Sequence, residues 1–146
     1  DNIGGLIGWN KKDGKVNGSE VSAQGVVSVS GRSQVGGLIG VNDGTVTNSN
    51  SHALVTGKRY NAGGLIGTNH GSLRNVEAGG KITGMWSVGG LVGTNDGNIK
   101  DSHCTVYVNS TGNNIGGWSG YKAAGIGSDV DAEKNMHSTP RSPVGG

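Results

Sequence analysis

The stretch VGGLIGVNDGTVTNS, residues 35–49, sets two glycines before a Leu-Ile pair, a third glycine after it, and Asn-Asp-Gly beyond. Close copies begin at four other places: IGGLIGWN from Ile3, AGGLIGTN from Ala62, VGGLVGTN from Val88 and a weaker IGGWSGYK from Ile115. The first glycines of these pairs, and of one more pair near the end of the chain, are Gly4, Gly36, Gly63, Gly89, Gly116 and Gly145. Their spacing of 26–32 residues indicates an internal repeat, which is the signature of repeat architectures.

The composition narrows the class of protein. Glycine supplies 31 of the 146 residues and phenylalanine is absent, whereas glycine makes up about 7% of an average protein. Two prolines and no three-residue glycine period exclude collagen, and the regular Val, Ile and Leu positions oppose disorder. Charges are scattered singly and the formal net charge is +2, so we expect neither a nucleic-acid partner nor insertion into a membrane.

Each repeat contains three short apolar or β-branched pieces separated by glycine or polar turns. In the second repeat these are GGLIG, TVTNS and ALVTG; in the fourth they are GGLVG, NIKDS and TVYVN. Three strands in about 27 residues suit one rung of a parallel β-solenoid, whereas a propeller blade usually takes about 40 residues and four strands. We therefore predict an all-β protein, a parallel β-solenoid with about five rungs of 26–32 residues and three short strands per rung. Right-handed winding is expected because parallel crossovers are overwhelmingly right-handed.

The repeats set the expected boundaries along the chain. Residues 1–127 are assigned to the solenoid, with repeats at about 3–34, 35–61, 62–87, 88–114 and 115–127 onward. Residues 128–146 read as an irregular polar loop or tail that leads into a truncated next repeat, with Met136 as its one inward-facing candidate. Because the chain begins and ends inside the motif, we expect it to be a piece of a longer array.

Stacking the repeats predicts which side chains lie inside. One ladder contains Leu6, Leu38, Leu65 and Leu91, with Trp118 as a bulkier last member. A second contains Val16, Val46, Leu73 and Ile99. A third contains Val29, Val55, Ile82 and Val108, with Val27, Ala53, Gly80 and Val106 two places earlier on the same face. The only cysteine, Cys104, aligns with Ser51 and Ala78 and is expected to point inward.

Two further sets of residues read as scaffold. The glycine pairs are expected at the corners of the rungs, where a residue without Cβ or able to take positive φ is needed; they are Gly4, Gly5, Gly36, Gly37, Gly63, Gly64, Gly89, Gly90, Gly116 and Gly117. Asparagines recur six places after the first glycine, at Asn10, Asn42, Asn69 and Asn95. Stacked amides can hydrogen-bond from rung to rung, so these four are predicted to form a ladder.

Candidate functional residues are few. Five aromatic residues lie beside the glycine corners and could contact a glycan or a protein partner, or simply cover the scaffold: Trp9, Tyr60, Trp86, Trp118 and Tyr121. Asp13, Asp43, His70 and Asp96 occupy corresponding turn positions and form either a ligand-holding strip or ordinary solvated turns. The histidines lack metal-ligand spacing, and the acids lack the neighbouring pair of a polysaccharide-cleaving site. We therefore predict no catalytic, metal or cofactor-binding residue, no cofactor, and no enzymatic activity.

The repeated Gly-Gly-Leu-(Ile/Val)-Gly-x-Asn, followed by glycine and an apolar residue, resembles the GLUG repeat over about residues 3–120. The fifth copy departs from that pattern because it lacks the Leu and the Asn. The resemblance implies a β-solenoid segment of an extracellular or cell-surface bacterial or phage protein, and it implies no chemistry. Three readings stay open: a structural or adhesive segment whose partner is a host-surface protein or glycan, a subunit that stacks end to end with copies of itself into a filament, and an accessory region of a secreted protease.

Overall fold

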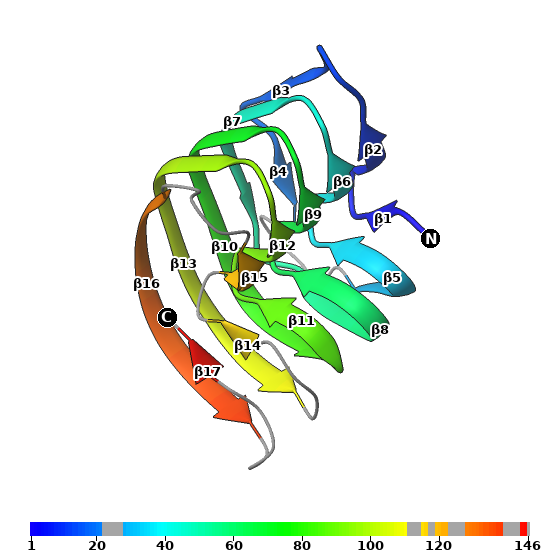
Figure 1. The fold of residues 1–146 in the computed structure, drawn as a ribbon, viewed down its shortest axis with the longest axis vertical. Coiled ribbons are helices and arrows are strands. Elements are labelled where there is room, and N and C mark those ends of the chain that lie inside the picture. Colours follow the sequence, from blue (N-terminus) through cyan, green and yellow to red (C-terminus); the bar gives the residue numbers. More distant parts are fainter. Residues whose placement is uncertain (22–27, 111–114, 117–118, 123–127, 139–143, 146) are drawn as a thin grey trace.

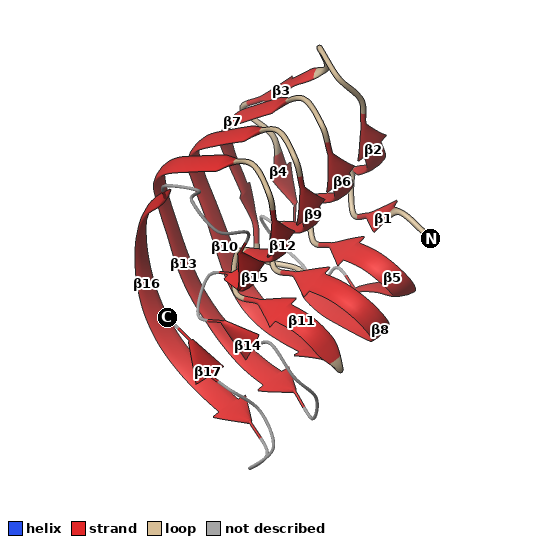
Figure 2. Cartoon of the chain, viewed as in Figure 1, coloured by secondary structure: helices blue, strands red, loops and turns tan. Residues whose placement is uncertain are grey.

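The computed structural model describes residues 1–21, 28–110, 115–116, 119–122, 128–138 and 144–145. These residues form strands, bends and turns, and no helix occurs among them. Every pair of hydrogen-bonded strands is parallel, and each strand pairs with the strand that occupies the same place in the next repeat. Figure 1 shows the resulting stack of similar rungs, and Figure 2 shows how much of each rung is strand. The predicted all-β, parallel β-solenoid is confirmed.

Three lines of strands run along the stack. The first line contains β1 (Ile3–Gly4), β5 (Ser28–Gly36), β8 (Leu54–Gly63), β11 (Trp86–Gly89), β14 (Ile115–Gly116) and β17 (Val144–Gly145). The second is a five-stranded sheet of β2 (Ile7–Asn10), β6 (Ile39–Asn42), β9 (Ile66–Asn69), β12 (Val92–Asn95) and β15 (Ser119–Lys122). The third contains β3 (Lys15–Asn17), β4 (Glu20–Val21), β7 (Thr45–Ser51), β10 (Ser72–Gly84), β13 (Asn98–Ser110) and β16 (Ser128–Ser138).

The strands do not divide each repeat as the sequence predicted. GGLIG in the second repeat is not one strand: β5 ends at Gly36, Gly37 and Leu38 lie in a bend, and β6 begins at Ile39. Conversely, the predicted second and third pieces of the fourth repeat run together as the single strand β13. The long strands bend and continue around the rung, which joins the first and third lines into one twelve-stranded sheet.

The glycine pairs form corners for a steric reason. None of their described members has a positive φ; among the described glycines only Gly18 and Gly80 do. A Cβ on Gly36 would lie 2.7 Å from the Gly67 nitrogen of the next rung, and a Cβ on Gly37 would overlap the Gly64 carbonyl oxygen. Because real Cβ atoms do not approach backbone this closely, the corner excludes every other residue type. The expectation of glycine was right: the described corners need a residue without Cβ and do not need positive φ.

The predicted interior ladders are largely present. The second ladder pairs Val46 with both Val16 and Leu73, and the third pairs Val55 with both Val29 and Ile82. All described members of these two ladders are buried, as are Leu38, Leu65, Leu91, Ala53, Val106 and the row of Ser51, Ala78 and Cys104. Two members were predicted wrongly. Leu6 is 53% exposed, and Gly80 is exposed with a positive φ of 88°. Val27, Trp118 and Gly117 lie outside the described residues.

The segment that read as a polar loop or tail is partly regular. Residues 128–138 form β16, which pairs in parallel with β13 and sets Ala132 opposite Cys104 and Met136 opposite Val108. The alternation of Val130, Ala132 and Met136 with polar residues has the two-residue period of a strand, and the charged residues between them obscured it. Residues 139–143 and 146 lie outside the described part of the chain.

Candidate functional site

The four predicted asparagines form a buried ladder, here called the inner asparagine row. Asn10, Asn42 and Asn69 each donate from Nδ2 to Oδ1 of the asparagine in the following rung, all at 2.8 Å. Asn42, Asn69 and Asn95 are fully buried, and each also donates to the carbonyl oxygen two residues ahead. Because their donors and acceptors are used within the scaffold, these amides hold the rungs together and are closed to ligands.

The aromatic candidates fall into two environments. Tyr60 and Trp86 occupy the same position in neighbouring rungs of β8 and β11, and they are 52% and 39% exposed. Their neighbours Lys58, Arg59 and Met85 are also exposed. We call Tyr60 and Trp86 the aromatic pair; it is an uncovered patch of a kind that contacts partners.

Trp9 is engaged within the scaffold although half of it is exposed. Its indole nitrogen donates to Asp43 Oδ2 at 2.6 Å, and Lys11 Nζ lies 5.3 Å from the ring centroid. The hydrogen bond to Asp43 ties the first rung to the second, which favours the scaffold interpretation. Trp118 lies outside the described residues, and Tyr121 is placed only by the pairing of β15 with β12, opposite Thr94.

The charged turn positions are paired unequally. His70 Nδ1 lies 3.1 Å from Asp96 Oδ2, with both side chains partly exposed. Asp43, on the opposite rung, accepts the Trp9 indole instead. The turns therefore contain separate local pairs, because Asp43 is bonded to Trp9 and His70 is paired with Asp96.

The structure contains an outer row that the sequence analysis missed. Asn48, Asn75 and Asp101 stack on β7, β10 and β13, are exposed, and have positive φ values of 50°, 50° and 48°. Asn75 Nδ2 donates to Asn48 Oδ1 at 2.8 Å, and Asn48 Nδ2 donates to Asn17 Oδ1 at 2.9 Å. We call Asn48, Asn75 and Asp101 the outer asparagine row. A signal was present, because Asn and Asp tolerate left-handed backbone and recur here in TNS, RNV and KDS.

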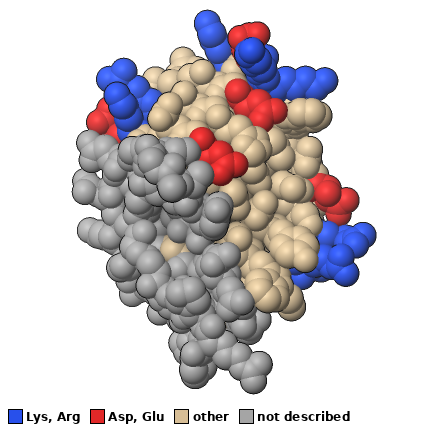
Figure 3. All heavy atoms as spheres, in the orientation of Figure 1, with Lys and Arg blue, Asp and Glu red and all other residues tan. Residues whose placement is uncertain are grey.

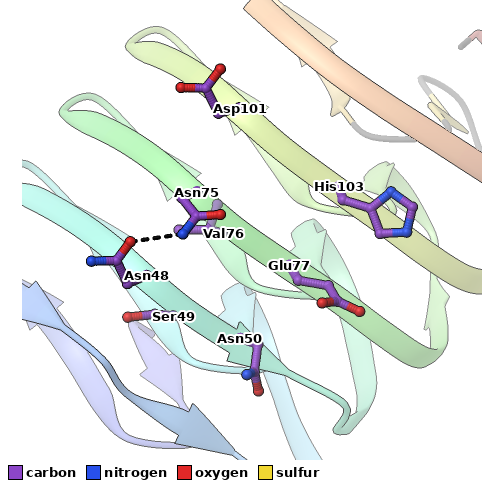
Figure 4. A pocket seen from close by; sticks show the side chains of 8 residues that line it. All are labelled: Asn48, Ser49, Asn50, Asn75, Val76, Glu77, Asp101 and His103. Atoms are coloured by element: carbon purple, nitrogen blue, oxygen red, sulfur yellow. Dashed lines mark hydrogen bonds between the residues drawn. The ribbon is translucent and has the colours of Figure 1, made fainter.

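A second polar row runs beside the first. Asn50, Glu77 and His103 are aligned by the parallel pairing of β7, β10 and β13, and all three are partly exposed. Between the two rows lies a groove of about 250 Å³, whose lining also includes the buried residues Ser49 and Val76. Figure 4 shows the two rows running side by side from strand to strand. We call this feature the outer groove.

The outer groove contains carboxylates with basic neighbours and one unsatisfied amide. Glu77 Oε1 lies 3.8 Å from His52 Nε2, and Arg74 Nε lies 3.4 Å from Asp101 Oδ2. Asn50 Oδ1 is buried and has no hydrogen-bond partner among the described residues. A buried polar atom without a partner costs about 1–3 kcal/mol, so such atoms are uncommon in native proteins.

The remaining chemistry of the described residues is limited. They contain no group of three His, Cys, Asp or Glu side chains that could hold a metal ion. Burial raises the pKa of the Cys104 thiol to about 11, which keeps it protonated at neutral pH. On the face in Figure 3, basic and acidic side chains are interspersed. No described segment forms a helix long and apolar enough to cross a membrane.

The fold and these surfaces define a β-solenoid repeat protein with a closed interior and polar and aromatic features on its outside. In comparisons with known proteins, no family model matched the chain, and neither a curated protein nor a solved structure gave a significant match.

Proposed function

We propose that this chain is a non-catalytic repeat segment of an extracellular or cell-surface bacterial or phage protein, of the GLUG type, which presents a lateral binding surface. The observation that carries the proposal is the aromatic pair. Tyr60 and Trp86 are exposed and aligned on two rungs whose backbones are hydrogen-bonded to each other. Large aromatic side chains fixed on a rigid scaffold bind a glycan or protein with little loss of conformational entropy.

The test compares binding of the parent chain and of the double variant Tyr60→Ala/Trp86→Ala to a glycan array and to host cells. We expect the double variant to bind at least about tenfold more weakly, because each aromatic contact contributes about 0.5–1.5 kcal/mol beyond its buried area. The matched control is Tyr107→Ala, which removes another exposed tyrosine from β13. Equal binding by the parent chain and the double variant would contradict the assignment of the aromatic pair.

A second candidate function is end-to-end stacking into filaments, since the described rungs stack by parallel pairing of equivalent strands. Among the described residues β2 pairs with β6 alone, and Leu6 next to it is exposed. A sheet edge with unpaired backbone accepts another strand, and a head-to-tail contact that does not close gives a fibre. Negative-stain electron microscopy with light scattering over a concentration series tests this candidate. Rods that lengthen with concentration are expected, whereas monodisperse particles at every concentration contradict it.

A further inference from the structure

The outer groove repeats its polar groups at the spacing of the rungs. Parallel strands lie about 4.8 Å apart, so Asn50, Glu77 and His103 offer hydrogen-bonding groups at regular steps along the stack. The outer asparagine row offers a second set at the same steps (Figure 4). A ligand that matches both rows must be an extended chain with polar groups at a similar repeat, and a sugar residue within a linear oligosaccharide has about this length.

The chemistry of the lining suits hydroxyl groups. Amides both donate and accept hydrogen bonds, and ionised carboxylates accept two or more. Glu77 and Asp101 each have a basic neighbour, His52 and Arg74, within 4.0 Å. Because each carboxylate already has such a neighbour, the groove offers no concentrated charge to a highly charged polymer. An uncharged, polyhydroxylated chain fits these groups best.

Part of the groove is already ordered for a ligand. Asn75 and Asn48 are joined by a hydrogen bond, and Asn48 is held in turn by Asn17. Side chains fixed before binding lose less entropy on binding. Asn50 differs, because its Oδ1 is buried without a partner. Rotation about its terminal torsion, which is soft in amides, exchanges Oδ1 with Nδ2, so that Asn50 can present either an acceptor or a donor to a ligand hydroxyl in the groove.

From these observations we infer that the outer groove of β7, β10 and β13 binds a neutral linear oligosaccharide that lies across the three strands. The inference rests on the proposed binding function but uses a surface other than the aromatic pair. Asn50 and Glu77 hydrogen-bond to the sugar hydroxyls, and Asn48 and Asn75 align the chain along the groove.

The experiment uses the ¹⁵N-labelled full chain and three neutral hexasaccharide probes: β-1,4-linked glucose, α-1,4-linked glucose and β-1,4-linked N-acetylglucosamine. We expect at least one probe to shift the side-chain amide signals of Asn48, Asn50 and Asn75 saturably. Asn50→Val is expected to weaken that binding at least about tenfold without lowering the melting temperature, because it removes an unsatisfied atom rather than a contact. Ser72→Ala, an exposed change elsewhere on β10, is the matched control and should bind like the parent chain.

Three outcomes would overturn the inference. No probe shifts these amides; or a probe shifts only the Trp86 indole signal, which leaves the aromatic pair as the site and removes the groove; or hexalysine shifts the amides while no saccharide does, which makes the groove a peptide site. Loss of cell binding by the Tyr60→Ala/Trp86→Ala variant with intact saccharide shifts in the groove would support both proposals independently.

Discussion

The inner and outer asparagine rows both repeat asparagine at the spacing of the rungs, but the inner row is buried and the outer row is exposed. In the inner row, Asn69 is fully buried and hydrogen-bonds to an asparagine on either side. In the outer row, Asn75 donates to Asn48 in a bond of equal length, 2.8 Å, but both residues are exposed. A repeated asparagine in the sequence therefore does not by itself indicate whether the side chain stabilises the fold or faces solvent. Burial decides whether its hydrogen bonds stabilise the fold or leave polar groups available to a partner.

The inner row also has a direction and a limit. Each amide donates to the following rung, and the last described donor in the row, Asn95 Nδ2, donates to the carbonyl of Gly97. Opposite Asn95 the fifth repeat has Lys122, whose side chain has no acceptor atom. The row therefore cannot continue through that position in the same way. The outer row changes at the preceding rung, where Asp101 replaces asparagine and pairs with Arg74.

The largest expected difference between the rows comes from the same substitution made in each. Asn69→Asp replaces a buried donor by an acceptor that faces Asn95 Oδ1, so we expect the free energy of unfolding at pH 7 to fall by about 3–5 kcal/mol, as for an uncompensated buried charge. Asn75→Asp is its matched control in the outer row and should cost less than about 1 kcal/mol, since water solvates the new carboxylate. Urea denaturation of both variants measures the contrast.

Measurements at acidic pH add a second test of this first prediction. A protonated carboxyl at position 69 donates again, so the deficit of Asn69→Asp should shrink as the pH is lowered toward 4, whereas Asn75→Asp should show little such recovery. Equal losses for the two variants at pH 7 would mean that burial does not separate the rows.

The second prediction concerns the interior beside the outer groove. Cys104 and His103 are adjacent on β13 but face opposite ways, and only Cys104 is fully buried. Burial raises the pKa of the Cys104 thiol from 9.0 to about 11, which lowers the thiolate fraction at pH 8 about 100-fold. Alkylation by iodoacetamide in native buffer, followed by mass spectrometry, should be at least that much slower than in 6 M guanidinium chloride.

The sign of the linkage for Cys104 is fixed by the direction of its shift. A folded-state pKa above the unfolded value means that the native protein binds more protons between pH 9 and 11. Stability associated with this thiol is therefore present below pH 9 and is lost as the pH rises toward 11. Rapid native alkylation at pH 8 would show that the interior opens locally at β13.

The sequence predicted those features of the fold that follow from the spacing of the repeats, and it predicted less well those that depend on the environment of one side chain. The repeat of GGLIGxN predicted the parallel solenoid, the ladder from Val16 to Ile99 and the inner asparagine row, because all three follow from register alone. It predicted Leu6 wrongly: this side chain is 53% exposed, although Val16 in the same rung is buried. The glycine corners were also predicted; of the two reasons offered, the need for a residue without Cβ holds at Gly36, and the need for positive φ does not.

The outer groove was missed because its residues differ between repeats. Asn50, Glu77 and His103 occupy the same position in successive repeats, but they are an amide, a carboxylate and an imidazole. No sequence pattern therefore identifies them as a set. The left-handed backbone at Asn48, Asn75 and Asp101 was missed for a related reason. Corners were predicted only at glycine pairs, although asparagine and aspartate can adopt the same backbone conformation. The aromatic pair was found because Tyr60 and Trp86 are conspicuous, although sequence alone could not separate them from Trp9, whose indole is bonded to Asp43.

The third prediction separates backbone strain from hydrogen bonding in the outer row. Asn75 has a φ of 50°, which costs a residue with Cβ roughly 1–2 kcal/mol unless its side chain compensates. We expect Asn75→Ala to lower the free energy of unfolding by about 1–2 kcal/mol. Asn75→Gly, which removes the same hydrogen bond and adopts this φ freely, should stay within about 0.5 kcal/mol of the parent. Equal losses in the two variants would assign the effect to the bond with Asn48 instead.

The smallest change in stability is expected when the ion pair at the end of the outer row is removed, and it tests whether that pair has a structural role. Arg74 and Asp101 lie 3.4 Å apart with side chains 71% and 56% exposed; pairs of this kind contribute about 0–1 kcal/mol and are screened by salt. Arg74→Ala should therefore change the free energy of unfolding by less than about 0.5 kcal/mol, and 0.5 M NaCl should remove most of that difference. Lys100→Ala, a neighbouring basic residue on β13, is the matched control for the change in net charge. A loss above about 1 kcal/mol that persists in salt would mean that the outer row holds the rungs together as the inner row does, and it would leave fewer of its groups available to a ligand.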